Sequence, residues 1–287
     1  MIPIRALVAA ALVALPSVAL AQTAPSPTPA PSASPAPAAT PNAIGAAFGA
    51  NDPCTSLSAI VSRPTVTNSV CTVRPNHVEI ETGYQNTTAD GGGSTVAYPQ
   101  TAIRIGTTIP ALEFDIAPPS INRSSSGGVA TTGTTDVGAG LKYVFGYSPK
   151  ASWGGQVFFT EPTGTNGFSS NGTNATYALQ GSYTLNSVFS LAGGVQDLSI
   201  ANNGNRYTSI VPSLVLSASL PNGNGLYAEA SEFTRALGPG TPTRTQFIVG
   251  ALRDVGQRLQ VDVEGGWSPT VSTGKYRYVG FGLSYYF

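Results

Sequence analysis

The chain ends in Val279-Gly-Phe-Gly-Leu-Ser-Tyr-Tyr-Phe287, a stretch in which every second residue is bulky and apolar. Side chains of a β-strand alternate between its two faces. Phe281, Leu283, Tyr285 and Phe287 therefore share one apolar face, and the residues between them are small or polar. The stretch predicts a strand between an apolar and a polar environment. It would be either an edge strand of a soluble sandwich or a strand of a membrane barrel.

The same alternation recurs from residue 77 onwards, in segments of roughly ten residues separated by turns. Long connections rich in Gly, Ser, Thr and Asn are expected at 86–95, 119–133, 161–174, 199–206, 235–243 and 268–274, with short turns between them. Long loops on one side and short turns on the other are typical of outer-membrane barrels, and a soluble sandwich has no reason for them. The sequence thus predicts an all-β fold, a transmembrane antiparallel up-and-down β-barrel of about 12 strands over residues 77–287.

The first 50 residues predict export. Residues 1–21 carry Arg5, then an apolar run and a small-x-small cleavage site at Ala19-Leu20-Ala21, which is the pattern of a signal peptide. The apolar run is shorter than the roughly 20 residues that a membrane-spanning helix needs. Residues 22–50 are rich in Pro and Ala, a composition that predicts a disordered periplasmic tether.

The two cysteines, Cys54 and Cys71, lie in a short segment, residues 51–76, between the tether and the first strand. Export to an oxidising compartment and an even number of cysteines favour a Cys54–Cys71 disulfide over two thiols. We expect this segment to lie in the periplasm, apart from the barrel. No His cluster accompanies the cysteines, so no metal site is predicted.

Charged residues of the predicted barrel fall on its inward face. Each lies between apolar neighbours on its strand, and a charge that faces lipid is costly, so these side chains should point into the lumen. The candidate lumen-lining residues are Glu79, Glu81, Arg104, Glu113, Asp115, Lys142, Asp262 and Glu264. Two interpretations stay open: an acid-biased solute pathway, or structural packing of a narrow interior. Twelve strands lie between about eight, whose interior is filled by side chains, and 16–18, which leave an aqueous channel.

Two stretches carry a family resemblance. Val78-Glu-Ile-Glu-Thr-Gly-Tyr84 and Asp136-Val-Gly-Ala-Gly-Leu-Lys-Tyr-Val-Phe145, with the C-terminal strand, resemble the outer-membrane β-barrel family named for the MetA pathway of phenol degradation. The resemblance covers residues 77–287. Members of that family are described as transporters, so the resemblance implies transport and supplies no catalytic residues.

Several classes of function can be set aside. Lys+Arg and Asp+Glu number 14 each, so no basic excess indicates nucleic-acid binding. Outer-membrane enzymes typically use His with Ser or Asp at the outer rim. The one histidine, His77, lies at the start of the first strand, away from that rim. We therefore expect no catalytic, cofactor-binding or metal-binding residues.

The expected function is the passage of small solutes, hydrophobic ones included, through a transporter or narrow channel. It would act in the outer membrane of a Gram-negative-type bacterium, with both termini in the periplasm. The alternative is a structural or surface-display barrel that binds partners through its outer loops. Expected partners are outer-membrane lipid, an unidentified small-molecule solute and the barrel-assembly machinery. For that machinery the assembly signal would be Phe281, Leu283, Tyr285 and Phe287.

Overall fold

The computed structural model describes residues 52–202 and 205–287. The predicted signal peptide (1–21) and tether (22–50) lie outside these residues. Within the described part of the chain, no helix is long and apolar enough to cross a membrane. The helical elements there are α2 (Leu57–Ile60), η1 (Pro221–Gly223) and η2 (Val271–Thr273). The strands are β1 (Val78–Ala89), β2 (Ser94–Tyr98), β3 (Ala102–Gly106), β4 (Leu112–Ala117), β5 (Ile121–Ser126), β6 (Val129–Thr134), β7 (Val137–Tyr147), β8 (Ala151–Glu161), β9 (Asn174–Thr184), β10 (Phe189–Asn202), β11 (Asn205–Leu220), β12 (Asn224–Phe233), β13 (Arg244–Val255), β14 (Leu259–Ser268) and β15 (Tyr276–Tyr286).

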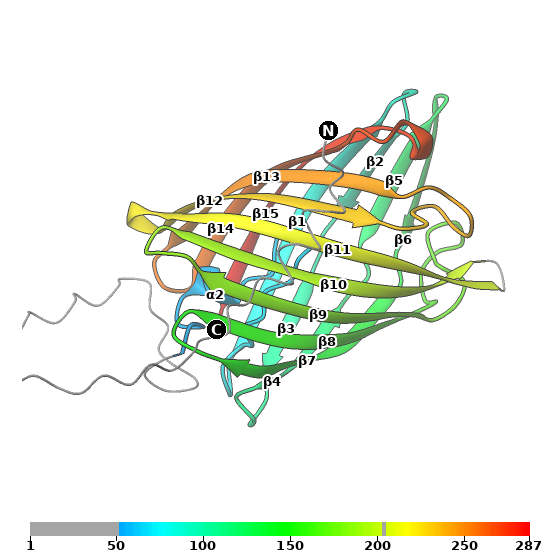
Figure 1. Cartoon of the computed structure of the whole chain (residues 1–287). Coiled ribbons are helices and arrows are strands. Elements are labelled where there is room, and N and C mark those ends of the chain that lie inside the picture. The colour runs from blue at the N-terminus through cyan, green and yellow to red at the C-terminus, as the bar shows by residue number, and fades with distance from the viewer. Residues whose placement is uncertain (1–51, 203–204) are drawn as a thin grey trace, which may run out of the picture. The chain divides into compact units, whose positions relative to one another are not determined.

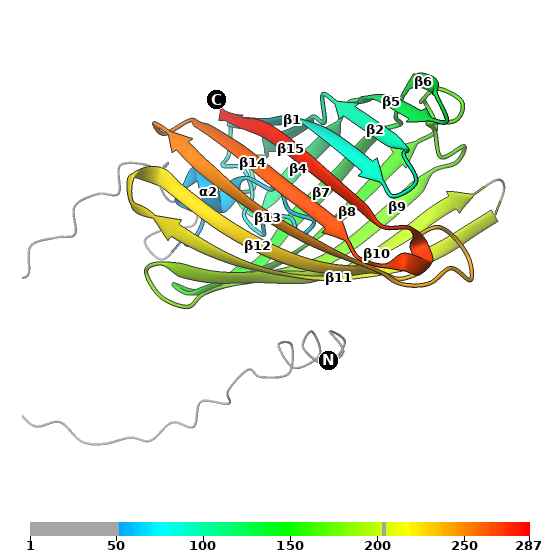
Figure 2. The same ribbon diagram turned by 90° about the horizontal axis from the view of Figure 1, so that it is seen from above.

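The strands form one antiparallel sheet that closes on itself, because β15 pairs with β1. The closed ring has 12 strands, which confirms the predicted barrel. At the seam the register runs from Glu79 opposite Tyr286 to Ala89 opposite Tyr276. Figures 1 and 2 show the strands tilted around a common lumen, with α2 near the end that holds the C-terminus.

The two ends of the barrel differ in their connections. One end, here the long-loop end, carries the connections 162–173 and 234–243. The other, the short-turn end, holds the start of β1 and the C-terminus, where the Phe287 N–H donates to the Val78 carbonyl at 2.8 Å.

Three predicted loops are paired strands instead. Residues 86–95 belong mostly to β1 and β2, residues 119–133 to β5 and β6, and residues 199–206 to β10 and β11. These stretches are rich in Ser, Thr and Asn, so both strand faces are polar and no alternation marks them as strands. Glycines make the tight turns of the first two hairpins: Gly91 and Gly92 have φ of 108° and 90°, and Gly127 and Gly128 have φ of 58° and 81°. The barrel wall is therefore taller at its long-loop end than predicted.

Apolar side chains cover the outside of the barrel. Phe281, Leu283 and Phe287 of the predicted assembly signal are 59%, 41% and 54% exposed, and the Tyr285 ring packs edge-on against Phe287 at 4.7 Å. Ser284, which lies between them on the opposite face, is fully buried. This alternation is the one predicted for the strand.

The long connection between β8 and β9 is held by one carboxylate outside the regular strands. Asp136, between β6 and β7, accepts hydrogen bonds from the backbone N–H of Gly164 and Ser170, both at 2.9 Å, and from the Ser170 hydroxyl at 2.6 Å. Burial raises the pKa of Asp136, but hydrogen bonds from Ser170, Ser169 and the Gly164 backbone outweigh it and lower the pKa to about 2.

Candidate functional site

The lumen at the short-turn end is filled by the chain's own residues 52–76, which we call the plug. Gly83 and Gly282 of the wall lie against it so closely that a Cβ at either position would be 2.4 Å from the Arg63 guanidinium. The sequence predicts residues 51–76 in the periplasm, apart from the barrel. Its contacts with the wall place it inside the ring, a position that cannot be predicted from the sequence because residues 51–76 have no strand periodicity.

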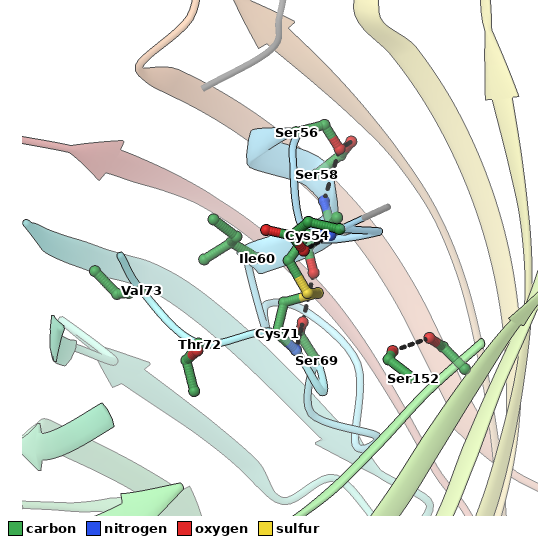
Figure 3. Close-up of a disulfide and its surroundings, with 12 residues drawn as sticks. Cys54, Ser56, Ser58, Ile60, Ser69, Cys71, Thr72, Val73 and Ser152 are labelled. Atoms are coloured by element: carbon green, nitrogen blue, oxygen red, sulfur yellow. Dashed lines mark hydrogen bonds between the residues drawn. A yellow bond between two sulfur atoms is a disulfide. The ribbon is translucent and has the colours of Figure 1, made fainter. Parts of the chain in front are cut away.

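The plug is a small folded unit. The predicted Cys54–Cys71 disulfide is present, with sulfur atoms 2.02 Å apart. It packs with Leu57, Ile60 and Val73 in a cluster that the wall residue Tyr286 completes. Figure 3 shows the disulfide next to α2, with barrel strands around it. Ser56 caps the N-terminus of α2, because its hydroxyl accepts a hydrogen bond from the Ala59 N–H.

Arg104 on β3 is the centre of an ion-pair network at the plug. Its Nη1 lies 2.7 Å from Glu79 and 2.8 Å from Glu81, and its Nε lies 2.8 Å from Glu113. Lys142 lies on β7, the strand paired with β4, and its Nζ is 3.0 Å from Glu113 of β4. All five side chains are buried. Charges this far from water need partners, and here the wall supplies them across four strands.

The same arginine also binds the plug. Arg104 donates through Nη1 to the Ile60 carbonyl and through Nη2 to the Cys71 carbonyl, at 2.9 Å for the second. Both carbonyls belong to the loop that the Cys54–Cys71 disulfide closes. Arg104 therefore joins the wall carboxylates to the plug backbone.

Wall carboxylates accept hydrogen bonds from the plug backbone. Glu81 on β1 accepts from the N–H groups of Ser62 and Arg63 at 2.9 and 2.7 Å. Glu229 on β12 accepts from those of Val66 and Thr67, both at 2.7 Å. Such charge-assisted bonds are among the stronger hydrogen bonds in proteins.

Other polar groups hold the plug from the remaining sides. Gln180 on β9 and Gln196 on β10 donate to the carbonyls of Ser69 and Val66, at 3.0 and 2.7 Å. Further plug contacts come from Glu113 on β4, Gln156 on β8, Ser213 on β11, Asp262 on β14 and Tyr286 on β15. The glutamines were not predicted; their inward positions in the strand alternation were the signal that could have identified them.

The eight predicted lumen residues fall into two groups, and all are buried. Arg104 and five residues around it form one group: Glu79, Glu81, Glu113, Asp115 and Lys142. Asp262 and Glu264 lie apart from these: Asp262 pairs with the plug residue Arg63 at 3.5 Å, and Glu264 accepts from the Tyr278 hydroxyl at 3.3 Å. Within the barrel, most of these side chains contact the plug or one another, and Glu264 contacts Tyr278 of the wall.

A cavity of about 100 Å³ remains between the plug and the wall. It is lined by residues of β1, β3, β4, β7 and β8, with Ser62 and Asn68 of the plug. Among the residues that the structure describes, no group of three or more His, Cys, Asp or Glu is placed to hold a metal ion.

Comparisons with known proteins support the fold. No protein-family model matches the chain, and no curated protein does. Among solved structures, the chain is similar to the COG4313 outer membrane channel from Pseudomonas putida F1, with 13% identity, a TM-score of 0.59, and 78% of this chain and 100% of that chain covered.

Two further structures are more distant. They are the KdgM porin (14% identity, TM-score 0.46, 71% of this chain and 98% of that one) and the CymD monoaromatic hydrocarbon channel (11%, 0.40, 74% and 88%). At identities this low, the similarity concerns the fold alone. The fold is that of an outer-membrane barrel, and the family named for the MetA pathway stays a prediction.

Proposed function

We propose that the protein is an outer-membrane channel for small solutes whose lumen is closed by its own plug, residues 52–76. Its apolar outer face fits lipid. The short turns at the end that holds Val78 and Phe287 would face the periplasm, as they do in bacterial barrels generally. This orientation also places the plug at the periplasmic end of the lumen.

The observation that carries the proposal is how the plug is held. Leu57, Ile60 and Val73 pack on one another, on the disulfide and on the wall residue Tyr286, and Val66 packs on an apolar cluster of the wall. The plug backbone, in contrast, is held by hydrogen bonds to polar side chains of the wall. Polar contacts can be exchanged for water when a segment moves, and buried apolar contacts cannot. A plug of this kind can leave its seat without unfolding the barrel, and the 12-stranded ring then encloses a narrow passage.

Conductance in planar bilayers tests the proposal. We expect the purified mature protein to open rarely, and a variant lacking residues 52–76 to conduct continuously. Because that deletion could prevent folding, Glu81→Gln combined with Glu229→Gln provides a milder variant that keeps the whole chain. Heat-dependent electrophoretic mobility checks that each barrel is assembled.

The alternative is a structural or surface-display barrel, and the closely filled lumen favours it if the plug never moves. An assembled barrel that lacks the plug and still does not conduct would establish this alternative and exclude a channel. Continuous conductance of the variants with rare openings of the wild type would exclude a purely structural role.

A further inference from the structure

One side of the barrel's outer face turns from apolar to polar toward the long-loop end. On β15 the outward side chains Phe281 and Val279 are 59% and 61% exposed, and the next outward residue is the exposed Arg277. On β1 the positions opposite Val279 and Arg277 are held by Asn86 and Thr88. Directly opposed residues share a face of the sheet, so the apolar belt gives way to polar side chains on both strands.

The polar surface continues over β2 and β5, which lie toward the end away from the C-terminus (Figure 1). Thr88 is opposite Ser94 of β2, and Ser94 is opposite Ser125 of β5, so these three hydroxyls share the outer face. Arg123, two positions from Ser125, also faces outward and is exposed. We call this surface the polar band: Asn86, Thr88, Ser94, Arg123, Ser125 and Arg277. The outward positions of β15, β1, β2 and β5 at this end, all within the described residues, hold two arginines and no carboxylate.

The polar band differs in charge from the rest of the rim. Two exposed turn residues flank it, Lys275 and Asp90, and the Asp90 N–H donates to the Lys275 carbonyl at 2.9 Å. Three cations thus face one carboxylate on this side. The outward positions of β8, β10, β11 and β12 near the same end hold three carboxylates and one cation: Glu161, Asp197, Glu232 and Arg206. The Arg206 guanidinium donates to Ser199 and to the Thr173 carbonyl.

A tryptophan indicates the depth of the polar band in the membrane. Trp267 on β14 is opposite Arg277, faces outward and is 43% exposed. Tryptophan is enriched at the boundary between hydrocarbon and head groups, so Arg277 lies at the depth of the lipid head groups. Three strand spacings of about 4.8 Å and two residues of about 3.3 Å separate Arg277 from Arg123, so their Cα atoms lie about 16 Å apart.

We infer that the polar band binds the head group of lipopolysaccharide, the phosphorylated glycolipid of the outer leaflet. Arg123 and Arg277 bind its phosphates, because a guanidinium matches two phosphate oxygens with two parallel N–H donors. The hydroxyls of Thr88, Ser94 and Ser125 lie between the arginines and face the sugar rings, for which they can donate or accept. A disaccharide with a phosphate on each sugar suits two arginines about 16 Å apart better than a phospholipid with one phosphate does. The inference requires the long-loop end to face outside, as proposed above, and does not require the lumen to conduct.

Native mass spectrometry of the purified mature protein in detergent, titrated with bisphosphoryl lipid A, tests the inference. Dephosphorylated lipid A keeps the sugars and acyl chains, and phosphatidylglycerol keeps a phosphate without the disaccharide. Arg123→Gln combined with Arg277→Gln removes both charges from the polar band. The matched control is Arg206→Gln combined with Arg253→Gln, which removes the same charge from outward positions of β11 and β13, away from the band. Heat-dependent electrophoretic mobility checks that each barrel is assembled.

We expect saturable binding of bisphosphoryl lipid A, weakened about tenfold or more in the band variant and unchanged in the control variant. No saturable binding by the wild type would overturn the inference, and so would equal weakening in both variants. Equal affinity for dephosphorylated lipid A would mean that the phosphates are not recognised, and equal affinity for phosphatidylglycerol would assign the band to phospholipid; either result contradicts the inference. The titration needs no current through the barrel, so its failure is distinguishable from failure of the conductance test.

Discussion

Glu229 offers the sharpest test of how the plug is held. It is a buried carboxylate on β12 that accepts the N–H groups of Val66 and Thr67, and the Thr67 hydroxyl lies 2.8 Å away. Glu229→Ala removes all three acceptor contacts but leaves the donors in the plug. A hydrogen bond to a charged group contributes about 1.5–3 kcal/mol. Since water can enter the space left behind, we expect the free energy of opening the plug to fall by about 3 kcal/mol.

Amide hydrogen exchange measures that loss directly. A change of about 3 kcal/mol corresponds to roughly 100-fold faster opening, so peptides covering residues 62–69 should exchange faster by that factor. Exchange in β12 should stay slow, because the strand keeps its pairing with β11 and β13. Glu264→Ala is the matched control: this lumen carboxylate accepts from Tyr278 on its own sheet.

Two results would refute the reasoning. If plug peptides of Glu229→Ala exchange at the wild-type rate in an assembled barrel, the backbone bonds to Glu229 do not hold the plug. If Glu264→Ala accelerates amide exchange in the plug peptides by the same factor, the cause is a general loss of lumen charge and not the loss of specific contacts.

Three further changes probe other parts of the molecule. Thiol labelling of unreduced, unfolded protein should find neither Cys54 nor Cys71 reactive, and replacing both by serine should loosen the plug by up to about 3 kcal/mol, seen as faster exchange at residues 56–73. Arg104→Met leaves three wall carboxylates without their shared cation and should lower the free energy of unfolding by about 3–5 kcal/mol, measured in denaturant; an unchanged midpoint would contradict the network. Asp136 has a lowered pKa, so its contribution to loop order is complete above its unfolded value near 4 and is lost as pH falls toward 2. Protection of the amides of residues 162–173 against exchange, relative to the unfolded chain at the same pH, should therefore fall over that range, and Asp136→Asn should show the loss of protection already at pH 7.

The sequence allowed the barrel to be predicted where one face of each strand meets lipid. Leu283 is exposed and Ser284 is buried, because apolar and small residues alternate along this strand. That alternation can be recognised from the amino-acid sequence alone. At the long-loop end, β5 and β6 carry Ser and Thr on both faces, so their pairing depends on backbone hydrogen bonds that leave no pattern in the sequence.

The plug could not be predicted in the same way. A glutamate that faces the lumen has the same neighbours in sequence whether it is hydrated or accepts an N–H from another segment. Glu81 lies 19 positions from its plug partner Ser62, and Glu229 lies 162 positions from Thr67; both became recognisable as plug ligands only when the fold brought these residues together. Long-range pairing of this kind has no local signature.

The span of these contacts has a consequence for how the chain reaches its final state. Arg74 and Tyr286 meet although 212 positions separate them, so the plug cannot be fully seated until the last strand has closed the ring. Contacts of such separation form late, because the entropy of closing a long loop must be overcome first. The cysteines, only 17 positions apart, can join before any strand pairs. The disulfide can therefore restrain the plug before the barrel closes. The final docking of the plug then orders few additional residues.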